Sequence, residues 1–302
     1  MIQVSEILKN FKGRLTNNEK LAPFTTFKIG GLADYYAEPL DAEDLLSLLK
    51  YISENEKQFC IIGNGSNILV SDEGYRGFII NLEKGFTNLE HRDGRIICGA
   101  GVKLAIFVDF CINHHYAGVE MLAGIPGTMG GALIMNAGAY SGKISDHLES
   151  VKAVKNNGLL TIPKELCGFA YRNSNLQKMI VLEGTFSLPQ GNQDELSLVR
   201  KQLILKRNEA QPVEMPNAGS IFKNPKENYA AKLIQECGLK GMRYGGAMIS
   251  TKHTNFIVNY DRATANDIIE LIKAVRSKVK DITGIELELE VKLVGFEEGV
   301  IK

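Results

Sequence analysis

The chain has 302 residues, 44% hydrophobic and 23% charged, which is ordinary globular composition with room for two domains or one large domain with subdomains. Lysine plus arginine and aspartate plus glutamate number 35 each, and this net charge of zero argues against a nucleic-acid-binding protein, which usually carries a basic excess. The first residues, MIQVSEILKNF, lack the pattern of a secretory signal, and no apolar run approaches the roughly 18 residues that a membrane span needs.

Hydrophobic periodicity and turn residues predict an α+β fold. In chain order, we expect a helix at 41–53 with Asp41 as its N-cap, strands at 58–62, 68–70, 78–81 and 95–98, a helix at 102–116, and strands at 151–154 and 179–186. After a turn signal at 189–192, we expect helices at 196–211 and 228–237, a strand at 255–260, a helix at 264–283 and a strand at 285–293. Thr264 and Asp267 predict a capping box, and Gly284 ends that last helix. We therefore divide the chain into a glycine-rich unit at 1–190 and a smaller α+β unit at 200–302.

The five cysteines are scattered without a C-x-x-C pair. This usage indicates reduced, mostly buried thiols, a cytoplasmic location and no metal site. No obligate protein partner is evident from the sequence.

Glycine is concentrated between Gly118 and Gly142, where it supplies seven of 25 residues. The densest part, AGIPGTMGGALIMNAGAYSG, starts at Ala123. Bare backbone N–H groups in such a run can hold a pyrophosphate, and a short helix opening after GTMGG would add a positive dipole end. A set of tight turns between strands is the structural alternative.

A second glycine loop, GNGSN at 63–67, follows the strand at 58–62. It starts like a dinucleotide fingerprint, but Ile68 replaces the third glycine, and Gly99-Ala100-Gly101 has the same defect at Leu104. The chain also has no phosphate-binding G-x-x-x-x-G-K-[ST] loop. Together with the stretch at 123–142, GNGSN suggests two loops that hold one long cofactor without a Rossmann unit; alone, it is as consistent with an ordinary turn.

Two further segments contain candidate residues for substrate binding or catalysis. FAYRNS places Arg172 beside an aromatic residue, and arginine can bind a carboxylate through two hydrogen bonds; a solvated surface arginine is the alternative. In PNAGSIFKNP, Gly219 permits a turn that presents Ser220. No histidine has a spacing that suggests a general base, so we favour Ser220 as a proton donor or substrate contact over a nucleophile, with a serine turn as the alternative.

The C-terminal segment IELELEVKLV alternates apolar and charged residues. This pattern predicts a half-buried strand with an acidic face. Either that face is merely solvated, or one of its carboxylates reaches a cleft.

Six segments, in this order, resemble the UDP-N-acetylenolpyruvoylglucosamine reductase family, also called the UDP-N-acetylmuramate dehydrogenases. They are TTFKIGG (25–31), IIGNGSNILVSDEGYRG (61–77), AGIPGTMGGALIMNAGAYSG (123–142), AYRNS (170–174), NAGSIFKNP (217–225) and LELEVKLVG (287–295). They span nearly the whole chain, and the absence of the extra loop with a substrate-capping tyrosine resembles the shorter class of the family.

The resemblance implies a vanillyl-alcohol-oxidase-type (PCMH) FAD-binding domain of two α+β subdomains, followed by a smaller α+β substrate domain. It also implies an NADPH-dependent flavin oxidoreductase of peptidoglycan precursor synthesis, with FAD held non-covalently. NADPH reduces the FAD and leaves, and UDP-N-acetylglucosamine enolpyruvate then enters the same pocket and is reduced to UDP-N-acetylmuramate. Shared use of one pocket agrees with the lack of a second nucleotide fingerprint.

By motif, the resemblance implies that the flavin N5 gives hydride to C3 of the enolpyruvyl group and that Ser220 gives the proton to C2. Arg172 would stabilise the developing negative charge, and Glu290, carried by the strand at 285–295, would be its partner. Because Leu289 and Lys292 stand where this motif often has proline and arginine, Glu288 remains open as the catalytic carboxylate.

The resemblance also implies binding residues. The expected substrate contacts are Tyr171, Lys223, Asn224 and Asn255. The expected FAD-binding residues are Gly63, Asn64, Gly65, Ser66, Asn67, Gly124, Ile125, Gly127, Thr128 and Gly131. A flavin oxidase on the same fold, or a non-catalytic FAD or sugar-nucleotide binding module, are the alternative functions.

Overall fold

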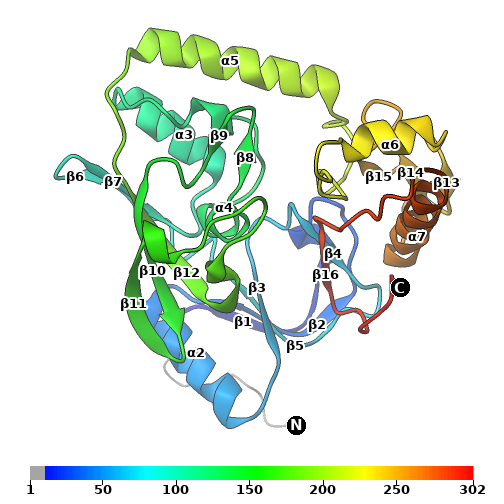
Figure 1. Cartoon of the computed structure of the whole chain (residues 1–302). Helices are drawn as coiled ribbons and strands as arrows, with labels where there is room; N and C mark the ends of the chain where they lie inside the picture. Colours follow the sequence, from blue (N-terminus) through cyan, green and yellow to red (C-terminus); the bar gives the residue numbers. More distant parts are fainter. Residues whose placement is uncertain (1–10, 302) are drawn as a thin grey trace. The chain divides into compact units, whose positions relative to one another are not determined.

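The computed structural model describes residues 11–301, which form two compact units built from interleaved stretches of chain (Figure 1). Unit 1 contains residues 11–17, 35–64 and 77–206, and unit 2 contains residues 18–34, 65–76 and 207–301. This partition differs from a single cut between 190 and 200, because two early segments belong to unit 2. Residues 1–10, where the sequence predicts no secretory signal, lie outside the described residues.

The first sheet of the fold has four strands, in the order β1-β2-β5-β3. Their bounds are Arg14–Lys20 (β1), Leu32–Glu38 (β2), Tyr75–Asn81 (β5) and Phe59–Ile62 (β3). Strands β3 and β5 run parallel, with Cys60 opposite Ile79. Helix α2 (Ala42–Glu54) buries Leu45 and Leu48 in the same core as Phe78 of β5. This packing fixes β3, and therefore the start of the GNGSN loop that follows it.

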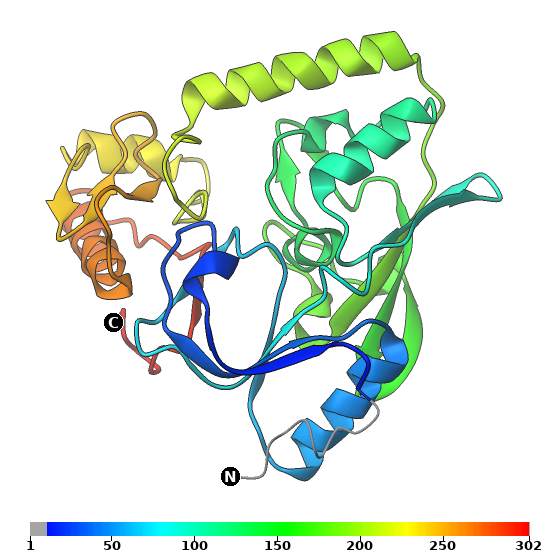
Figure 2. The same ribbon diagram turned by 180° about the vertical axis from the view of Figure 1, so that it is seen from behind.

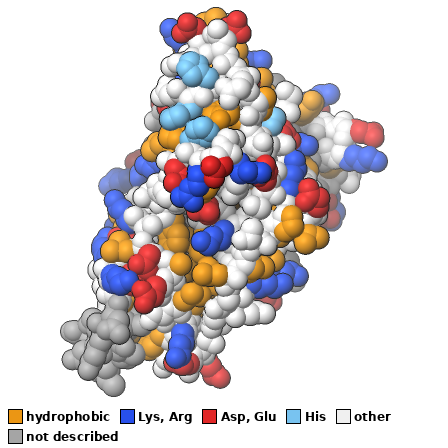
Figure 3. All heavy atoms as spheres, turned by 90° about the vertical axis from the view of Figure 1, so that its left-hand side faces the viewer, with side chains coloured by type: hydrophobic (Ala, Val, Ile, Leu, Met, Phe, Trp, Pro, Cys, Tyr) orange, Lys and Arg blue, Asp and Glu red, His pale blue; other side chains and the backbone are white. Residues whose placement is uncertain are grey.

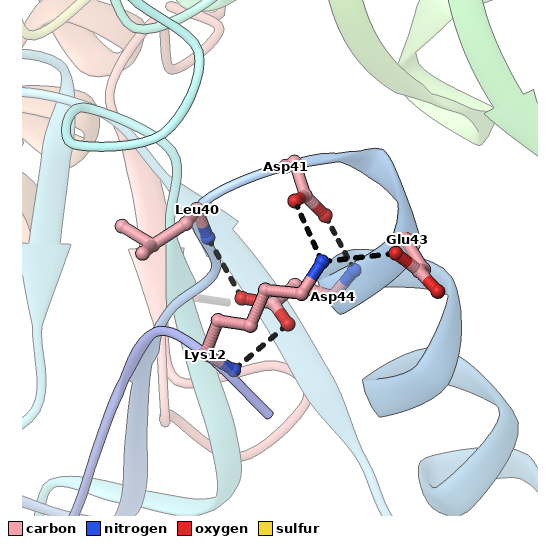
Figure 4. Close-up of polar contacts among 5 residues, drawn as sticks. All are labelled: Lys12, Leu40, Asp41, Glu43 and Asp44. Carbon is pink, nitrogen blue, oxygen red and sulfur yellow. Dashed lines mark hydrogen bonds and ion pairs between the residues drawn. The ribbon is translucent and has the colours of Figure 1, made fainter. Parts of the chain in front are cut away.

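A small network of hydrogen bonds and ion pairs stabilises the start of α2 (Figure 4). Asp41 is the N-cap, as predicted, and its side chain accepts a hydrogen bond from the backbone N–H of Asp44 at 2.9 Å. The ammonium group of Lys12 contacts carboxylate oxygens of Asp41 and Glu43 at 3.2 and 2.9 Å. The Asp44 carboxylate accepts from the backbone N–H groups of Lys12 and Leu40. Acidic groups at a helix N-terminus also stabilise its dipole.

The second sheet of unit 1 is antiparallel and has the order β11-β10-β12-β7-β6. Its strands are Gly158–Pro163 (β11), Leu148–Lys155 (β10), Ile180–Phe186 (β12), Arg95–Gly99 (β7) and Leu89–Arg92 (β6). Helices α3 (Leu104–Asn113) and α4 (Met129–Met135) pack against it, with the rings of Phe107 and Phe186 4.9 Å apart in the core. The pair β8 (Gly138–Ala139) and β9 (Gly142–Lys143) and the 3-10 turns Glu120–Leu122, Lys164–Leu166 and Asn175–Lys178 complete the unit.

Helix α5 (Gln193–Ala210) is largely exposed and buries only Leu196 (Figure 2). Within unit 1, polar contacts tie it to the rest of the chain. The guanidinium of Arg200 donates to the carboxylate of Asp109 on α3, and the hydroxyl of Tyr140 donates to the carbonyl of Leu203 at 3.0 Å.

Unit 2 has its own apolar core around helices α6 (Ala230–Glu236) and α7 (Ala265–Thr283). They pack with a three-stranded sheet of β13 (Arg243–Tyr244), β14 (Ala247–Ile249) and β15 (Ile257–Asn259), and the 3-10 turn Ala22–Phe24 also lies in this unit. Strand β16 (Lys292–Val294) runs parallel to β4 (Ile68–Val70), with Leu293 opposite Leu69. This pairing explains why residues 65–76 join the C-terminal part of the chain.

Most predicted elements are confirmed to within a few residues, including the capping box of Thr264 and Asp267 and the left-handed Gly284 at the end of α7. The predicted strand at 285–293 is wrong over most of its length. Only residues 292–294 belong to a strand, and before them Leu289 makes an isolated bridge to Phe222. The alternation of side chains is partly kept, because Leu287 and Val291 are buried while Glu286 and Glu288 are exposed.

Acidic and basic side chains are interspersed over the face shown in Figure 3. In the described part of the chain, no helix is long and apolar enough to cross a membrane. Four of the five cysteines are buried, and burial raises the pKa of the Cys60 thiol to about 11 and that of Cys111 to about 12. Such thiols remain protonated near neutral pH, which leaves them poor nucleophiles.

Candidate functional site

The glycine loops of unit 1 meet at one pocket. Gly63, which follows β3, lines it together with Gly101, Thr128 and Gly131. The remaining lining residues are Ile61, Ile62, Leu82, Glu83, Ala100, Gly130, Ile134, Met179, Ile180 and Val181. The pocket therefore combines apolar strand residues with bare backbone, as ligand pockets with a few placed polar groups do.

The contact between Gly63 and Thr128 is too close for a side chain on the glycine. A Cβ at position 63 would lie 2.3 Å from the Thr128 hydroxyl oxygen, whereas a Cβ at Gly131 would meet nothing closer than that oxygen at 3.8 Å. Gly127, with φ +133°, has backbone that favours glycine. The predicted association of the two glycine-rich segments is thus present within unit 1.

The backbone of the second segment is anchored to the loop before α3. The N–H groups of Met129 and Gly130 donate to the carbonyls of Val102 and Ala100 at 2.8 and 2.9 Å. The predicted helix does open here, as α4, with Thr128 at its N-cap. These two N–H groups are already bonded, however, so they cannot also serve as the anion-binding groups that the glycine pattern suggested.

Two other predicted cofactor residues lie on the approach to α4. Gly124 has a left-handed φ of +85°, and the N–H of Ile125 donates to the carbonyl of Leu122 at 3.1 Å. They shape the turn that precedes Gly127, and neither lines the pocket.

The GNGSN loop passes from unit 1 to unit 2 between Asn64 and Gly65. In unit 2, Gly65 has φ +63°, and its carbonyl accepts from the backbone N–H of Thr26 at 3.1 Å. A Cβ on Gly65 would lie 2.1 Å from the carbonyl oxygen of Phe24, so glycine is required. Ser66 and Asn67, partly buried, complete the loop before β4.

Arg172 sits at the tip of a two-residue turn in unit 1. Ala170 and Asn173 exchange backbone hydrogen bonds of 3.0 and 3.3 Å, which leaves Tyr171 and Arg172 between them. Arg172 has a left-handed φ of +54°, a conformation that a non-glycine residue adopts at a cost, and such strain clusters at functional sites. Its guanidinium carbon lies 5.2 Å from the centre of the Tyr171 ring, within the range of a cation–π contact.

This turn is attached to the C-terminal end of α4. The side-chain amide of Asn136 donates to the Ala170 carbonyl at 3.1 Å, and the hydroxyl of Ser174 donates to the Ile134 carbonyl at 2.7 Å. Because α4 has seven residues, its two ends are about 10 Å apart. One short helix therefore lines the pocket with Gly130, Gly131 and Ile134 and holds the Arg172 turn at its C-terminal end.

Ser220 lies in a loop of unit 2 whose backbone is held on both sides. Before it, the Asn217 side chain accepts from the N–H of Gly219 at 2.9 Å, and Gly219 has φ +74°. After it, the buried Asn255 bonds both polar backbone groups of Phe222: it accepts from the N–H at 3.0 Å and donates to the carbonyl at 2.8 Å. Asn255, expected as a substrate contact, thus uses its amide to position this loop.

The C-terminal carboxylates meet the same loop. The N–H of Glu290 donates to the Ile221 carbonyl at 2.8 Å, and the side-chain amide of Asn67 donates to the Glu290 carbonyl at 3.3 Å. Glu290 is half-buried. Glu288 is 73% exposed at its side chain and forms an ion pair with Lys223. The two glutamates that the sequence leaves equivalent therefore have different surroundings.

The remaining expected substrate contact in this unit is Asn224. It is exposed, and its side-chain oxygen accepts from the N–H of Ala230 at the start of α6 at 3.0 Å. Among the predicted residues, unit 2 thus brings together Asn67, Ser220, Lys223, Asn255 and Glu290, whereas unit 1 brings together Gly63, Thr128, Gly131, Tyr171 and Arg172.

Sequence reasoning missed the positioning residues Asn217 and Asn136 and most of the pocket lining, including Glu83. Asn217, two residues before a glycine, has a recognisable signal, because asparagine often bonds the backbone two residues on. Asn136 and Glu83 have no such local signal, since their partners or surroundings come from distant parts of unit 1. Among the described residues, no group of three potential metal ligands is present.

Two family models match successive parts of the chain. The family model described as "FAD binding domain" matches residues 33–162, and the model described as "UDP-N-acetylenolpyruvoylglucosamine reductase, C-terminal domain" matches residues 211–294. The UDP-N-acetylenolpyruvoylglucosamine reductase of Chloroherpeton thalassium is 39% identical over 100% of both chains. That of Caldanaerobacter subterraneus subsp. tengcongensis is 41% identical over 97% of each. The chain belongs to the UDP-N-acetylenolpyruvoylglucosamine reductase family.

The family's fold is confirmed by a solved structure. The crystal structure of UDP-N-acetylenolpyruvylglucosamine reductase from Thermus caldophilus matches with a TM-score of 0.80 and 34% identity, over 94% of this chain and 99% of that one. The predicted fold class, an FAD-binding domain with a smaller α+β domain, and FAD as the cofactor are therefore confirmed. The roles of individual residues remain predictions.

Proposed function

We propose that this chain is a cytoplasmic, NADPH-dependent FAD enzyme that reduces UDP-N-acetylglucosamine enolpyruvate to UDP-N-acetylmuramate in peptidoglycan precursor synthesis. One observation supports it most directly: in a chain of this reductase family, the backbone bond from Glu290 to Ile221 joins the Ser220 loop to the segment that carries Glu290.

The residues of unit 1 fit FAD. Gly63 and Gly131 leave bare backbone at the pocket, and Thr128 adds a hydroxyl between them. We assign the unit 1 part of the cofactor site to these residues with Asn64, Gly124, Ile125 and Gly127, and we keep Gly65, Ser66 and Asn67, which continue the same loop in unit 2, as proposed FAD contacts. When bound, FAD supplies the redox chemistry, taking hydride from NADPH and delivering it to C3 of the enolpyruvyl group.

Ser220 is the proposed proton donor to C2. Reduction of the double bond adds hydride at C3 and a proton at C2, so a donor must be held at the second carbon. The bonds of Asn217 and Asn255 fix the backbone on both sides of Ser220, which positions the Cα that carries its hydroxyl. A positioned proton donor contributes roughly 10²- to 10⁴-fold to a rate.

Arg172 and Glu290 are the proposed charged groups of the reaction. Hydride addition at C3 leaves negative charge towards the carboxylate of the substrate, and a fixed guanidinium would stabilise that charge. The left-handed turn at Arg172 holds the residue in one backbone conformation. Losing one fixed donor of this kind costs about 3–4 kcal/mol in other enzymes.

The remaining proposed contacts are with the sugar nucleotide. Lys223 is a cation for a phosphate or carboxylate, and Asn224 and Tyr171 present exposed polar groups. We propose that NADPH binds in the place that the sugar nucleotide later occupies and leaves before the sugar nucleotide enters.

The test is a kinetic assay of the purified protein. We expect a yellow protein that oxidises NADPH only when the enolpyruvyl sugar nucleotide is present, and a Ser220→Ala variant that keeps FAD but loses at least 100-fold in turnover. Ser277→Ala, on the exposed side of α7, is the matched control and should keep full activity. A protein that binds no FAD, or that passes electrons rapidly to air without the sugar nucleotide, would contradict the proposal.

A further inference from the structure

Glu83 is a carboxylate in the wall of the unit 1 pocket that none of the proposed chemistry uses. It follows β5 after Leu82 and lines the pocket together with Gly101 and Thr128. Its backbone is fixed, because its N–H donates to the side-chain oxygen of Asn81 at 2.8 Å. A Cβ on Gly101 would lie 2.9 Å from the Cα of Glu83, so glycine is needed where the segments after β5 and β7 approach each other.

One oxygen of this carboxylate, Oε1, is buried and has no hydrogen-bond partner among the described residues. A buried acceptor without a partner destabilises the state that holds it, and the effect is larger for a charged group. Burial raises the pKa of the Glu83 carboxyl, the nearby Lys103 and Lys84 and a side-chain hydrogen bond with Asn81 oppose the shift, and Glu38 adds to it. The group is therefore poised to accept hydrogen bonds from donors that a ligand brings.

The pocket suits one end of FAD. Its volume is about 60 Å³, far below the roughly 300–1,000 Å³ of a pocket that encloses a whole ligand. Ile61, Ile180 and Val181 give it apolar walls suited to a flat aromatic ring. Neither Tyr171 nor Arg172, the proposed substrate and catalytic residues of unit 1, lines it. Because the reactive flavin ring must meet Arg172, we assign the end of FAD in this pocket to the adenosine.

We propose that Glu83 recognises the adenosine of FAD by accepting hydrogen bonds from the ribose hydroxyls. A ribose offers two adjacent O–H donors, whereas a phosphate offers no donor when ionised and would be repelled by a carboxylate. The phosphates therefore lie away from Glu83, on the side of the pocket formed by Thr128 and Gly131. This inference rests on the proposed placement of FAD in unit 1.

The experiment measures ligand binding, by titrating flavin-free protein with FAD, FMN, ADP and 2′-deoxy-ADP. Glu83→Ala and the near-isosteric Glu83→Gln are compared with Glu54→Gln, a matched change on the exposed face of α2. We expect Glu83→Ala to weaken FAD binding about 10- to 100-fold while FMN binding is unchanged, because the lost hydrogen bonds involve a charged acceptor. The wild type should prefer ADP over 2′-deoxy-ADP, and both Glu83 variants should lose that preference.

The outcomes separate the two proposals. If the wild type binds FAD and both Glu83 variants bind it equally well, or if the wild type does not distinguish ADP from 2′-deoxy-ADP, the role of Glu83 is wrong and the enzyme assignment stands. If the wild type binds no FAD, the enzyme assignment fails as well. Should Glu83→Ala unfold, the Glu83→Gln titration decides.

Discussion

The carbonyl of Ile221 accepts a hydrogen bond from the backbone N–H of Glu290 at 2.8 Å, which joins the backbone of the residue after Ser220 to the backbone of Glu290. The two residues are far apart in sequence, yet the bond makes their relative position a property of the folded backbone. A proposed proton donor and a proposed charged partner are thus held by main chain, which is more rigid than contacts between long side chains.

The two C-terminal glutamates provide the sharpest test of this arrangement. We expect Glu290→Gln to lower turnover by at least tenfold, since the half-buried carboxylate is lost from the site. Glu288→Gln should change turnover by less than threefold, because that side chain is 73% exposed and its pairing with Lys223 is of the weak surface kind. Steady-state kinetics with the sugar nucleotide varied would reveal the difference, and the reverse order of effects would assign the catalytic carboxylate to Glu288.

Asn255 should act as a positioning residue. Removing its amide in Asn255→Ala leaves the buried N–H and C=O of Phe222 without these partners, at about 1–3 kcal/mol for each group, and frees the Ser220 loop. We expect turnover to fall well below wild type with a smaller change in KM.

The matched control is Asn259→Ala, because Asn259 also makes two backbone bonds, to Phe27 and Ala263, in the same unit. It should lose similar stability and keep turnover. Equal loss of turnover in both variants would mean that Asn255 matters only for folding.

Local signals in the sequence account for the elements that were predicted well. The capping box of Thr264 and Asp267 and the N-cap Asp41 depend on residues three positions apart, so the sequence alone reveals them. The motifs around Ser220 and Arg172 were found in the same way.

Long-range pairing accounts for what was missed. The alternation at 285–293 is that of a strand, but partners are available only where β16 meets β4, so a single bridge at Leu289 precedes a three-residue strand. No local pattern encodes a partner that is distant in sequence. For the same reason, the sequence does not reveal that residues 65–76 belong to unit 2 or that Asn255 makes two hydrogen bonds to the backbone of Phe222.

A long-range contact from Asp72 stabilises the start of α7. Asp72, which follows β4, accepts from the N–H groups of Ala265 and Asn266 at 2.9 and 3.1 Å and so supplements the cap of Thr264. We expect Asp72→Ala to lower the free energy of unfolding by about 0.5–2 kcal/mol. Asp261→Ala, an exposed aspartate paired only with its neighbour Arg262 at 3.6 Å, should have almost no effect in the same urea titration.

Because Gly63 lies against Thr128, substitutions at these two positions should have coupled effects on stability. Gly63→Ala places a Cβ 2.3 Å from the Thr128 hydroxyl and should destabilise the flavin-free protein, whereas in Gly63→Ala/Thr128→Ala the clash is removed and much of the loss should be recovered. Thermal melting of the four proteins of this cycle measures the coupling.

Gly131→Ala is the contrasting variant, because its Cβ meets nothing within 3.4 Å. It should leave the flavin-free protein as stable as the wild type and weaken FAD binding, since the methyl group would project into the proposed cofactor site. In the Gly63/Thr128 cycle, additive effects of Gly63→Ala and Thr128→Ala on the melting temperature would show that these two residues are not in close contact.

The pH dependence of FAD binding follows from the environment of Glu83. Burial raises the pKa of this carboxyl, while Lys103 and Lys84 oppose the shift and Glu38 adds to it. Only the ionised carboxylate accepts hydrogen bonds at both oxygens, so binding of the ribose favours the deprotonated form. The affinity for FAD should therefore be highest above the raised pKa and fall as the pH decreases through it.

In the Glu83→Gln variant, the affinity for FAD should no longer fall with pH on account of residue 83. In the Glu54→Gln variant, the affinity for FAD should depend on pH as it does in the wild type. FAD titrations between about pH 4 and pH 8 measure this, with FMN as the ligand that should show no contribution from Glu83. A wild-type affinity for FAD that rises as the pH falls would mean that the protonated carboxyl is the binding form, which contradicts acceptance from the ribose hydroxyls.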